Sequence, residues 1–120
     1  MREIRFRVWM GQKMILWEEL LAAHNLAAVL AGEFGPVMQY TGIVDSNGRP
    51  IYEDDIIDYD QHRRTTAWEN TTRERKRVRW TYDRWNIFSS EAGESRIEIV
   101  GNIYETPKLL SGPLKRQYMT

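Results

Sequence analysis

The stretch from Met38 to Tyr59 constrains the fold of this 120-residue chain more than any other. Its centre is Asp45-Ser46-Asn47-Gly48, in which Asn and Gly tolerate positive φ and favour a tight turn between strands. Strand-favouring residues precede the turn at 37–41 and follow it at 56–60. Pro50 cannot donate a ladder hydrogen bond, which places it at a sheet edge or before pairing begins. The stretch therefore predicts a strand, a turn, a short extended link and a second strand.

Alternation of apolar and polar residues marks further strands. At the N-terminus, Ile4, Phe6 and Val8 alternate with other residues at a period of two, which indicates a strand with one buried face. Closing a sheet removes the free edges that short strands would otherwise leave. We therefore expect a mainly β (α+β) fold, in which a small bent sheet or barrel-like domain carries one packed helix. Besides the central stretch, strands are expected near 3–9, 78–82, 85–88 and 97–104.

The packed helix is expected over residues 16–31. Five alanines between 22 and 31 favour helix, and Gly32 stands where a C-terminal cap belongs. The alternative is that Asn25 divides the segment into two short helices. An apolar stripe of helical period faces the core in this prediction, with Leu20 and Ala27 buried. The stripe consists of Leu16, Leu20, Ala23, Ala27 and Leu30.

The length and composition of the chain fit one domain. We expect a single domain over 1–110 and a C-terminal tail over 111–120. The chain contains no cysteine, which excludes disulfides and thiolate chemistry. No apolar run reaches transmembrane length, and the N-terminus lacks the apolar region of a signal peptide. These features predict a cytoplasmic protein without a membrane partner.

A group of carboxylates after the central turn raises the question of a metal site. The turn superficially resembles a calcium loop, but its glycine is the fourth loop residue instead of the sixth, and the twelfth is Ile56. We therefore expect a solvated turn and strand edge, with no metal and no cofactor. The carboxylates are Glu53, Asp54, Asp55, Asp58 and Asp60.

The two histidines do not form a recognisable catalytic set. His24 and His62 are far apart in the sequence, and neither has a spaced serine, aspartate or second histidine for nucleophilic or metal chemistry. We expect no catalytic residue, and a hydrolase that uses the acidic cluster is the least favoured hypothesis.

Charge is strongly polarised along the chain although its formal net charge is zero. Residues 61–79 hold seven basic and two acidic residues, whereas 45–60 hold six acids and one base. We expect 61–77 to be a solvated loop. A second interpretation is that this basic segment lies against the acidic strand of the same molecule or of a neighbour. The alternative is a single-stranded nucleic-acid-binding surface. Aromatic residues are interleaved with the basic ones, and aromatic rings stack on bases while arginines bind phosphates. The candidate binding surface is Arg73, Arg75, Lys76, Arg77, Arg79 and Trp85.

Four segments carry a resemblance to a known family. The central one comprises Gln39-Tyr40-Thr41-Gly42, Asp45, Asn47-Gly48, Ile51-Tyr52-Glu53 and Asp55-Ile56; the others are 2–9, Lys13-Met14 and 100–110. In order and spacing, these residues resemble the signature of the YopX family of phage and prophage proteins. The resemblance implies a viral or prophage origin and a mainly β domain, and it adds no catalytic residue. The family usually has glycine where this chain has Asp54, and aspartate is less suited to positive φ.

Two functional hypotheses follow. The first is a non-enzymatic phage accessory protein that acts through protein–protein contacts, either with a protein partner or as a homo-oligomer. It depends on the family resemblance, the missing catalytic set and the five Trp and six Tyr. The alternative is a single-stranded nucleic-acid-binding module that uses residues 61–85.

Overall fold

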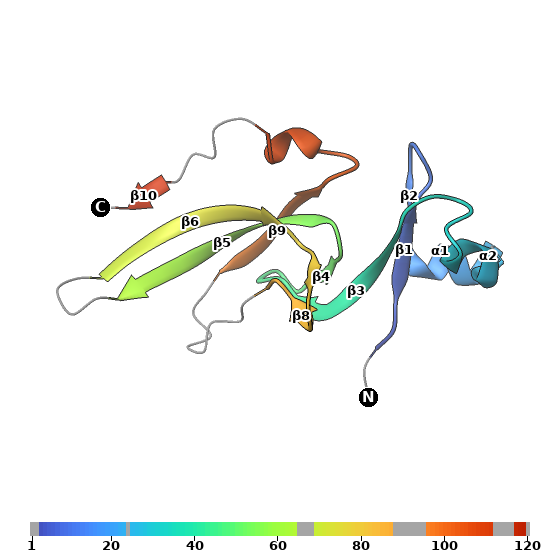
Figure 1. The fold of residues 1–120 in the computed structure, drawn as a ribbon, viewed down its shortest axis with the longest axis horizontal. Helices are drawn as coiled ribbons and strands as arrows, with labels where there is room; N and C mark the ends of the chain where they lie inside the picture. The colour runs from blue at the N-terminus through green and yellow to red at the C-terminus, as the bar shows by residue number, and fades with distance from the viewer. Residues whose placement is uncertain (1–2, 24, 65–68, 88–95, 112–116, 120) are drawn as a thin grey trace.

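The protein is a mainly β structure with two short helices at one end (Figure 1). The computed structural model describes residues 3–23, 25–64, 69–87, 96–111 and 117–119. The mainly β prediction is confirmed. The strands are β1 (Phe6–Trp9), β2 (Met14–Ile15), β3 (Val37–Val44), β4 (Pro50–Tyr52), β5 (Asp55–Arg64), β6 (Glu69–Arg77), β7 (Trp80–Thr81), β8 (Arg84–Trp85), β9 (Ile97–Asn102) and β10 (Gln117–Met119), and a 3-10 turn spans Pro107–Leu109.

The strands form two four-stranded antiparallel sheets and one small hairpin. One sheet has the order β2-β1-β3-β4, and the other has the order β10-β6-β5-β9. Strands β7 and β8 form the hairpin, in which Trp80 pairs with Trp85. In Figure 1, β5 and β6 form a long curved ribbon on one side and the helices lie on the other. The expected tail over 111–120 contains β10, which pairs with β6.

The helical segment is divided at Asn25, as the alternative prediction allowed. The helices are α1 (Trp17–Ala23) and α2 (Leu26–Leu30), and the Asn25 side chain caps α2 by accepting hydrogen bonds from the backbone N–H groups of Ala27 and Ala28. None of the described helices is long and apolar enough to cross a membrane.

The break at Asn25 resets the helical phase, and the predicted stripe is therefore only partly correct. Leu20 is 1% exposed, which confirms its burial. Ala27 is exposed, and the buried residue of α2 is Val29. Two further members of the stripe, Leu16 and Leu30, are about half exposed. The side chain of Ala23 lies outside the described part of the structure.

Among the residues that the structure describes, buried apolar side chains form two separate hydrophobic clusters. One joins β1, β2 and the helices, and the other joins β4, β5 and β9 with residues that flank the β7–β8 hairpin. The first cluster consists of Val8, Ile15, Leu20 and Val29, and the second of Ile51, Ile57, Val78, Ile87 and Ile97.

The prediction of a solvated loop over 61–77 is wrong. Strands β5 and β6 pair in antiparallel register from Ile56 opposite Arg77 to Arg64 opposite Glu69. The register places Asp58 opposite Arg75, and opposite charges in such positions favour pairing. Residues 65–68 lie outside the described part of the chain. The basic residues from Arg73 to Arg77 therefore lie on β6, opposite the acids Asp58 and Asp60 of β5, whereas Arg63 and Arg64 belong to β5 itself.

The central turn is confirmed. Gly48 has a φ of +81°, and a side chain of Asp45 closes the turn by accepting hydrogen bonds from the backbone N–H groups of Asn47 and Arg49, both at 2.9 Å. A third backbone N–H, from Ile99, donates to the second carboxylate oxygen of Asp45 at 3.2 Å. Burial acts to raise the pKa of Asp45, but the backbone donors of Arg49, Ile99 and Asn47 lower it below its ordinary value.

Replacing the turn glycine tests the positive φ. Gly48→Val should lower the free energy of unfolding by about 1 kcal/mol or more, because a β-branched residue is strained in the left-handed region. A Cβ at this position meets no atom within 4 Å, so the cost comes from the backbone conformation. Urea unfolding of Gly48→Val and of the control Asn47→Val measures the difference. Equal losses in the two variants would contradict the assignment.

Two neighbouring leucines test the helix packing. Leu20→Ala should cost roughly 2–5 kcal/mol because it opens a cavity in the buried cluster. Leu21→Ala removes the same atoms from a side chain that is 57% exposed, and it should cost no more than about 0.5 kcal/mol. Thermal unfolding of both variants provides the comparison. A Leu20→Ala variant as stable as Leu21→Ala would show that the cluster is not a core.

Candidate binding site

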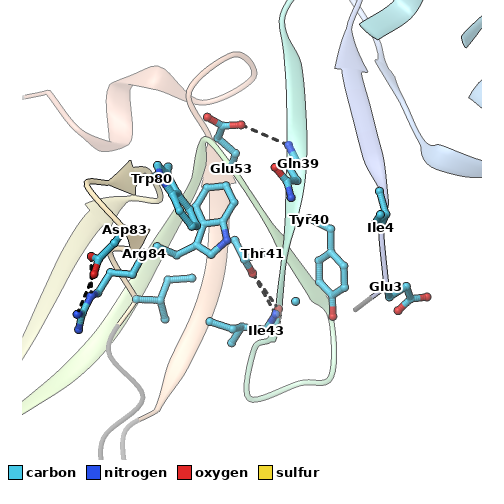
Figure 2. Close-up of a pocket in the computed structure, with 13 residues that line it drawn as sticks. Glu3, Ile4, Gln39, Tyr40, Thr41, Ile43, Glu53, Trp80, Asp83 and Arg84 are labelled. Carbon is cyan, nitrogen blue, oxygen red and sulfur yellow. Dashed lines mark hydrogen bonds and ion pairs between the residues drawn. The ribbon is translucent and has the colours of Figure 1, made fainter. Parts of the chain in front are cut away.

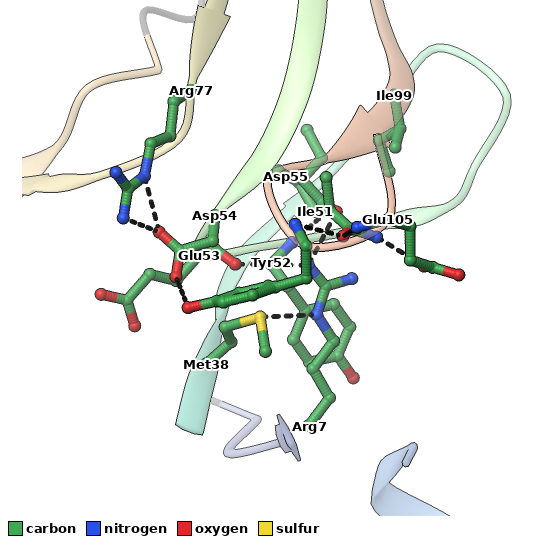
Figure 3. Close-up of polar contacts among 12 residues, drawn as sticks. Arg7, Met38, Ile51, Tyr52, Glu53, Asp54, Asp55, Arg77, Ile99 and Glu105 are labelled. Atoms are coloured by element: carbon green, nitrogen blue, oxygen red, sulfur yellow. Dashed lines mark hydrogen bonds and ion pairs between the residues drawn. The ribbon is translucent and has the colours of Figure 1, made fainter. Parts of the chain in front are cut away.

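A buried ion pair joins the two sheets next to the candidate site. Arg7 of β1 donates a hydrogen bond to Oδ1 of Asp55 at the start of β5 at 2.8 Å, and both side chains are less than a tenth exposed (Figure 3). Oδ2 of Asp55 accepts the backbone N–H of Tyr52 at 2.8 Å. The Arg7 guanidinium lies over the Tyr52 ring, 4.7 Å from its centroid, and Nε contacts Sδ of Met38. Burial raises the pKa of Asp55, although Arg7 and the Tyr52 N–H oppose this effect.

The neighbouring Asp54 occupies the position at which glycine is usual in the family that the sequence resembles. Its φ is +70°, so the backbone does require the left-handed region there. Arg77 donates to Oδ1 at 2.9 Å, and the hydroxyl of Tyr104 donates to Oδ2 at 3.2 Å. The backbone N–H of Asp54 donates to the carbonyl of Val78 at 2.9 Å. Asp54 thus has an unfavourable φ, but its carboxylate makes hydrogen bonds that a glycine at this position could not make.

The acidic cluster pairs with arginines across strands. Asp60 binds Arg73 at 2.8 Å, and Asp58 accepts two hydrogen bonds from Arg75 at 2.5 and 2.9 Å. The expectation that the basic segment lies on the acidic strand within the molecule is confirmed for these pairs. A solvated edge is wrong for Asp54 and Asp55, which are 7% and 2% exposed. Among the residues described, no three or more His, Asp or Glu side chains are grouped as metal ligands.

The remaining predicted surface residues lie beside and within the β7–β8 hairpin. Lys76 donates to the carbonyl of Asn86 and lies 4.6 Å from the centroid of the Tyr59 ring, and burial lowers its pKa. The side chain of Asn86 accepts the backbone N–H of Arg79 at 2.8 Å. Arg79 is exposed, whereas Trp85 is half-buried against Trp80. The structure thus separates the paired residues Arg73, Arg75, Lys76 and Arg77 from Arg79 and Trp85.

A trough of about 870 Å³ lies over β3 (Figure 2). Its floor is residues 39–43, one wall is the β7–β8 hairpin, and the other is the segment of Glu3 and Ile4 before β1. We call this feature the β3 trough. Its lining residues are Glu3, Ile4, Gln39, Tyr40, Thr41, Gly42, Ile43, Glu53, Trp80, Asp83, Arg84, Trp85 and Ile87.

An irregularity in β3 shapes the floor of the trough. The pairing of β3 with β4 changes register between Tyr40 and Val44, and Gly42 has a φ of +85°. The hydroxyl of Thr41 donates to the carbonyl of Ile51 at 2.7 Å and accepts the backbone N–H of Ile43 at 3.1 Å. A bulge of this kind redirects neighbouring side chains.

The lining combines exposed apolar groups with charged ones. Ile4 is 62% exposed and Trp80 is 51% exposed, and Trp80 meets Trp85 edge to face with ring centroids 5.1 Å apart. Sequence reasoning selected Trp85 but missed Glu3 and Ile4, because nothing in the first strand indicated that it would line a trough across β3 from the hairpin. Gly42 interrupts a strand pattern and was the available sign of a bulge.

The fold and the site describe a mainly β protein with a trough between a strand and a hairpin. The chain belongs to the YopX family: residues 21–111 match the family described as YopX protein. The match includes the central signature and the whole closing segment 100–110, while residues 2–9 and 13–14 precede it. No curated protein shows significant sequence similarity to the chain.

A solved structure has the same fold. The crystal structure of protein EF1440 from Enterococcus faecalis superimposes with a TM-score of 0.58 at 19% sequence identity. The alignment covers 92% of this chain and 100% of that chain. At this identity the likeness is one of fold, and the site is argued from the residues of this chain.

Removing one partner of the buried ion pair should destabilise the protein strongly. Asp55→Asn should lower the free energy of unfolding by roughly 3–5 kcal/mol, because it leaves Arg7 buried without a counter-charge. The control Asp58→Asn removes a carboxylate whose partner Arg75 is 33% exposed, and it should cost about 1 kcal/mol or less.

The double variant Arg7→Met, Asp55→Asn completes the test. It should be more stable than Asp55→Asn alone, because no unpaired charge remains buried. Urea unfolding of the four proteins provides the double-mutant cycle. Additive losses in Arg7→Met and Asp55→Asn would be incompatible with a coupled pair.

Proposed function

We propose that this YopX-family chain is a non-enzymatic accessory protein of a phage or prophage that acts in the cytoplasm of the bacterial host. It works through protein–protein contacts, including self-association, and the β3 trough is the site that binds a protein partner. The observation that carries this proposal is a trough lined by exposed apolar and aromatic side chains, next to basic residues that already have acidic partners.

The exposed aromatic groups favour a protein partner. Trp80 is half exposed on the trough wall, and Tyr82 at the tip of the same hairpin is fully exposed. Large aromatic residues are enriched at protein interfaces, where they supply much of the binding energy from a small area. A partner that covers the hairpin would remove both rings from water, which is the favourable term in most protein association.

Exposed leucines at the helical end of the molecule support self-association. Leu16, Leu21 and Leu30 are each about half exposed and belong to or border α1 and α2. These helices lie at the far end of the molecule from the β5–β6 hairpin (Figure 1). Exposed apolar patches often mark interaction surfaces.

The paired charges argue against nucleic acid as the first choice. Phosphate binding needs cationic side chains that are free to displace the counterions condensed on a nucleic acid. Arg73, Arg75 and Arg77 are instead paired with aspartates of the same molecule. The alternative of a single-stranded nucleic-acid-binding module retains support from exposed Arg79 and Trp80 on one hairpin.

Peptide selection provides the test of a protein-binding trough. A display library of random 12-residue peptides should yield binders to the immobilised protein, and their affinity should fall about tenfold or more in Trp80→Ala, the loss expected at a hot spot. Leu21→Ala removes an exposed apolar group from the helical end and should leave these peptides unaffected. Circular dichroism confirms that both variants are folded, and sedimentation velocity of the parent and both variants measures self-association.

Titration with fluorescein-labelled (dT)25 at two salt concentrations tests the alternative. We expect no steep loss of binding with salt, because binding is not driven by phosphate contacts. Tight, strongly salt-dependent binding of (dT)25, together with a library that yields no peptide, would replace the proposal by the nucleic-acid hypothesis.

A further inference from the structure

We infer that the β3 trough accepts an extended peptide segment carrying an arginine or lysine side chain, with Glu53 as its counter-ion and Trp80 as the ring beneath it. This inference rests on the proposed function, and it names the chemistry of the partner. It depends on the charge of the trough, the exposed ring and a similar arrangement elsewhere in the same molecule.

The trough carries an excess of negative charge. Its lining contains the carboxylates of Glu3, Glu53 and Asp83 but a single cation, Arg84. Asp83 binds Arg84 at 3.1 Å, and Glu3 binds Arg5 at 2.5 Å. The Asp83–Arg84 pair is largely exposed and the Glu3–Arg5 pair is partly exposed, so salt and water screen both pairs.

Glu53 has a different environment. Among the described residues, its carboxylate forms no ion pair, and Oε1 accepts one backbone hydrogen bond, from the N–H of Gln39 at 3.3 Å. A carboxylate has acceptor sites for about four hydrogen bonds, so most of its capacity is open to a ligand. Figure 2 shows Glu53 and Trp80 at the trough, on the opposite side of β3 from Ile4.

Trp80 supplies the surface that a cation prefers. Tryptophan is the strongest partner for a cation above an aromatic ring, and the attraction increases when the pair is shielded from water. Trp85 meets Trp80 edge to face at an interplanar angle of 84°, which fixes the orientation of the exposed ring. A guanidinium above this ring could also donate to a carboxylate, because its planar fork makes both contacts.

The protein already contains this combination in its interior. Arg7 lies 4.7 Å from the centroid of the Tyr52 ring and donates to the carboxylate of Asp55 at 2.8 Å. In the trough, Trp80 and Glu53 supply the ring and the carboxylate, and the ligand would supply the cation. The internal example shows that this backbone can hold a cation, a ring and a carboxylate together at ordinary distances.

The shape of the trough fits a peptide. Its volume of about 870 Å³ lies within the usual range of ligand sites and holds several side chains. Gly42 leaves open space on the floor, where a Cβ would meet no atom within 4 Å. The same carboxylates repel phosphate groups, so the charge that attracts a basic peptide disfavours nucleic acid.

The test uses two peptide mixtures that differ in one charge. One mixture is Ac-X-X-Arg-X-X-NH2, and the other has citrulline, which is neutral and nearly isosteric, in place of arginine. NMR titration of the unmutated protein follows the indole N–H signals of its tryptophans. The arginine mixture should shift the Trp80 signal, which is assigned by its absence in Trp80→Phe, and the citrulline mixture should bind about tenfold more weakly.

Paired variants identify the counter-ion. Glu53→Gln should weaken binding of the arginine mixture to the level of the citrulline mixture. Glu33 is an exposed carboxylate beyond α2, and Glu33→Gln should leave the affinity unchanged. Equal binding of arginine and citrulline, or undiminished binding in Glu53→Gln, would overturn the inference. Absence of any shift with the arginine mixture would overturn it as well.

The outcome can be separated from that of the proposed function. Display peptides that lose affinity in Trp80→Ala but lack basic residues would leave the proposed function standing and remove this inference. A Trp80 signal that responds to (dT)12 and to neither peptide mixture, together with a display library that yields no binder, would contradict both the inference and the proposed function.

Discussion

The buried contact between Arg7 and Asp55 is the interaction on which the rest of the structure depends. It connects the first strand to the start of β5, and therefore links the sheet that holds the helices to the sheet that holds the long hairpin. Two charges with less than a tenth of each side chain exposed are unfavourable unless each has partners. The Tyr52 N–H and the Tyr52 ring provide them, so the junction between the sheets has a defined geometry.

That geometry also determines the position of the candidate site. Glu53 and Asp54 lie between the end of β4 and the start of β5, and Asp54 ties the junction to β6 through Arg77. The β7–β8 hairpin follows β6 directly, so the same contacts bring Trp80 and Trp85 beside β3. The trough is thus a consequence of how the two sheets are joined.

Local features of the fold could be predicted from the sequence, and features that depend on distant residues could not. Gly48 predicts a turn because glycine adopts positive φ easily, and Asn25 marks a helix boundary because its side chain can cap a helix. The part of the β5–β6 ladder formed by 61–77 was missed because this segment contains many charges and almost no aliphatic side chains, and only the pairing of the two strands shows that Asp58 and Arg75 are opposite. The trough was missed because its lining comes from segments that are far apart in the sequence, such as those of Ile4 and Trp80.

The division of the interior into two hydrophobic clusters has a consequence for dynamics. The cluster of Val8, Ile15, Leu20 and Val29 is small and contains the short helices, whereas the other cluster lies between longer strands. Cooperative opening units often follow such divisions. The amides of α1 and α2 would therefore exchange with solvent through a partial opening that leaves the β5–β6 ladder intact. Amides near Asp55, where the two units meet, would mark the boundary between fast and slow exchange.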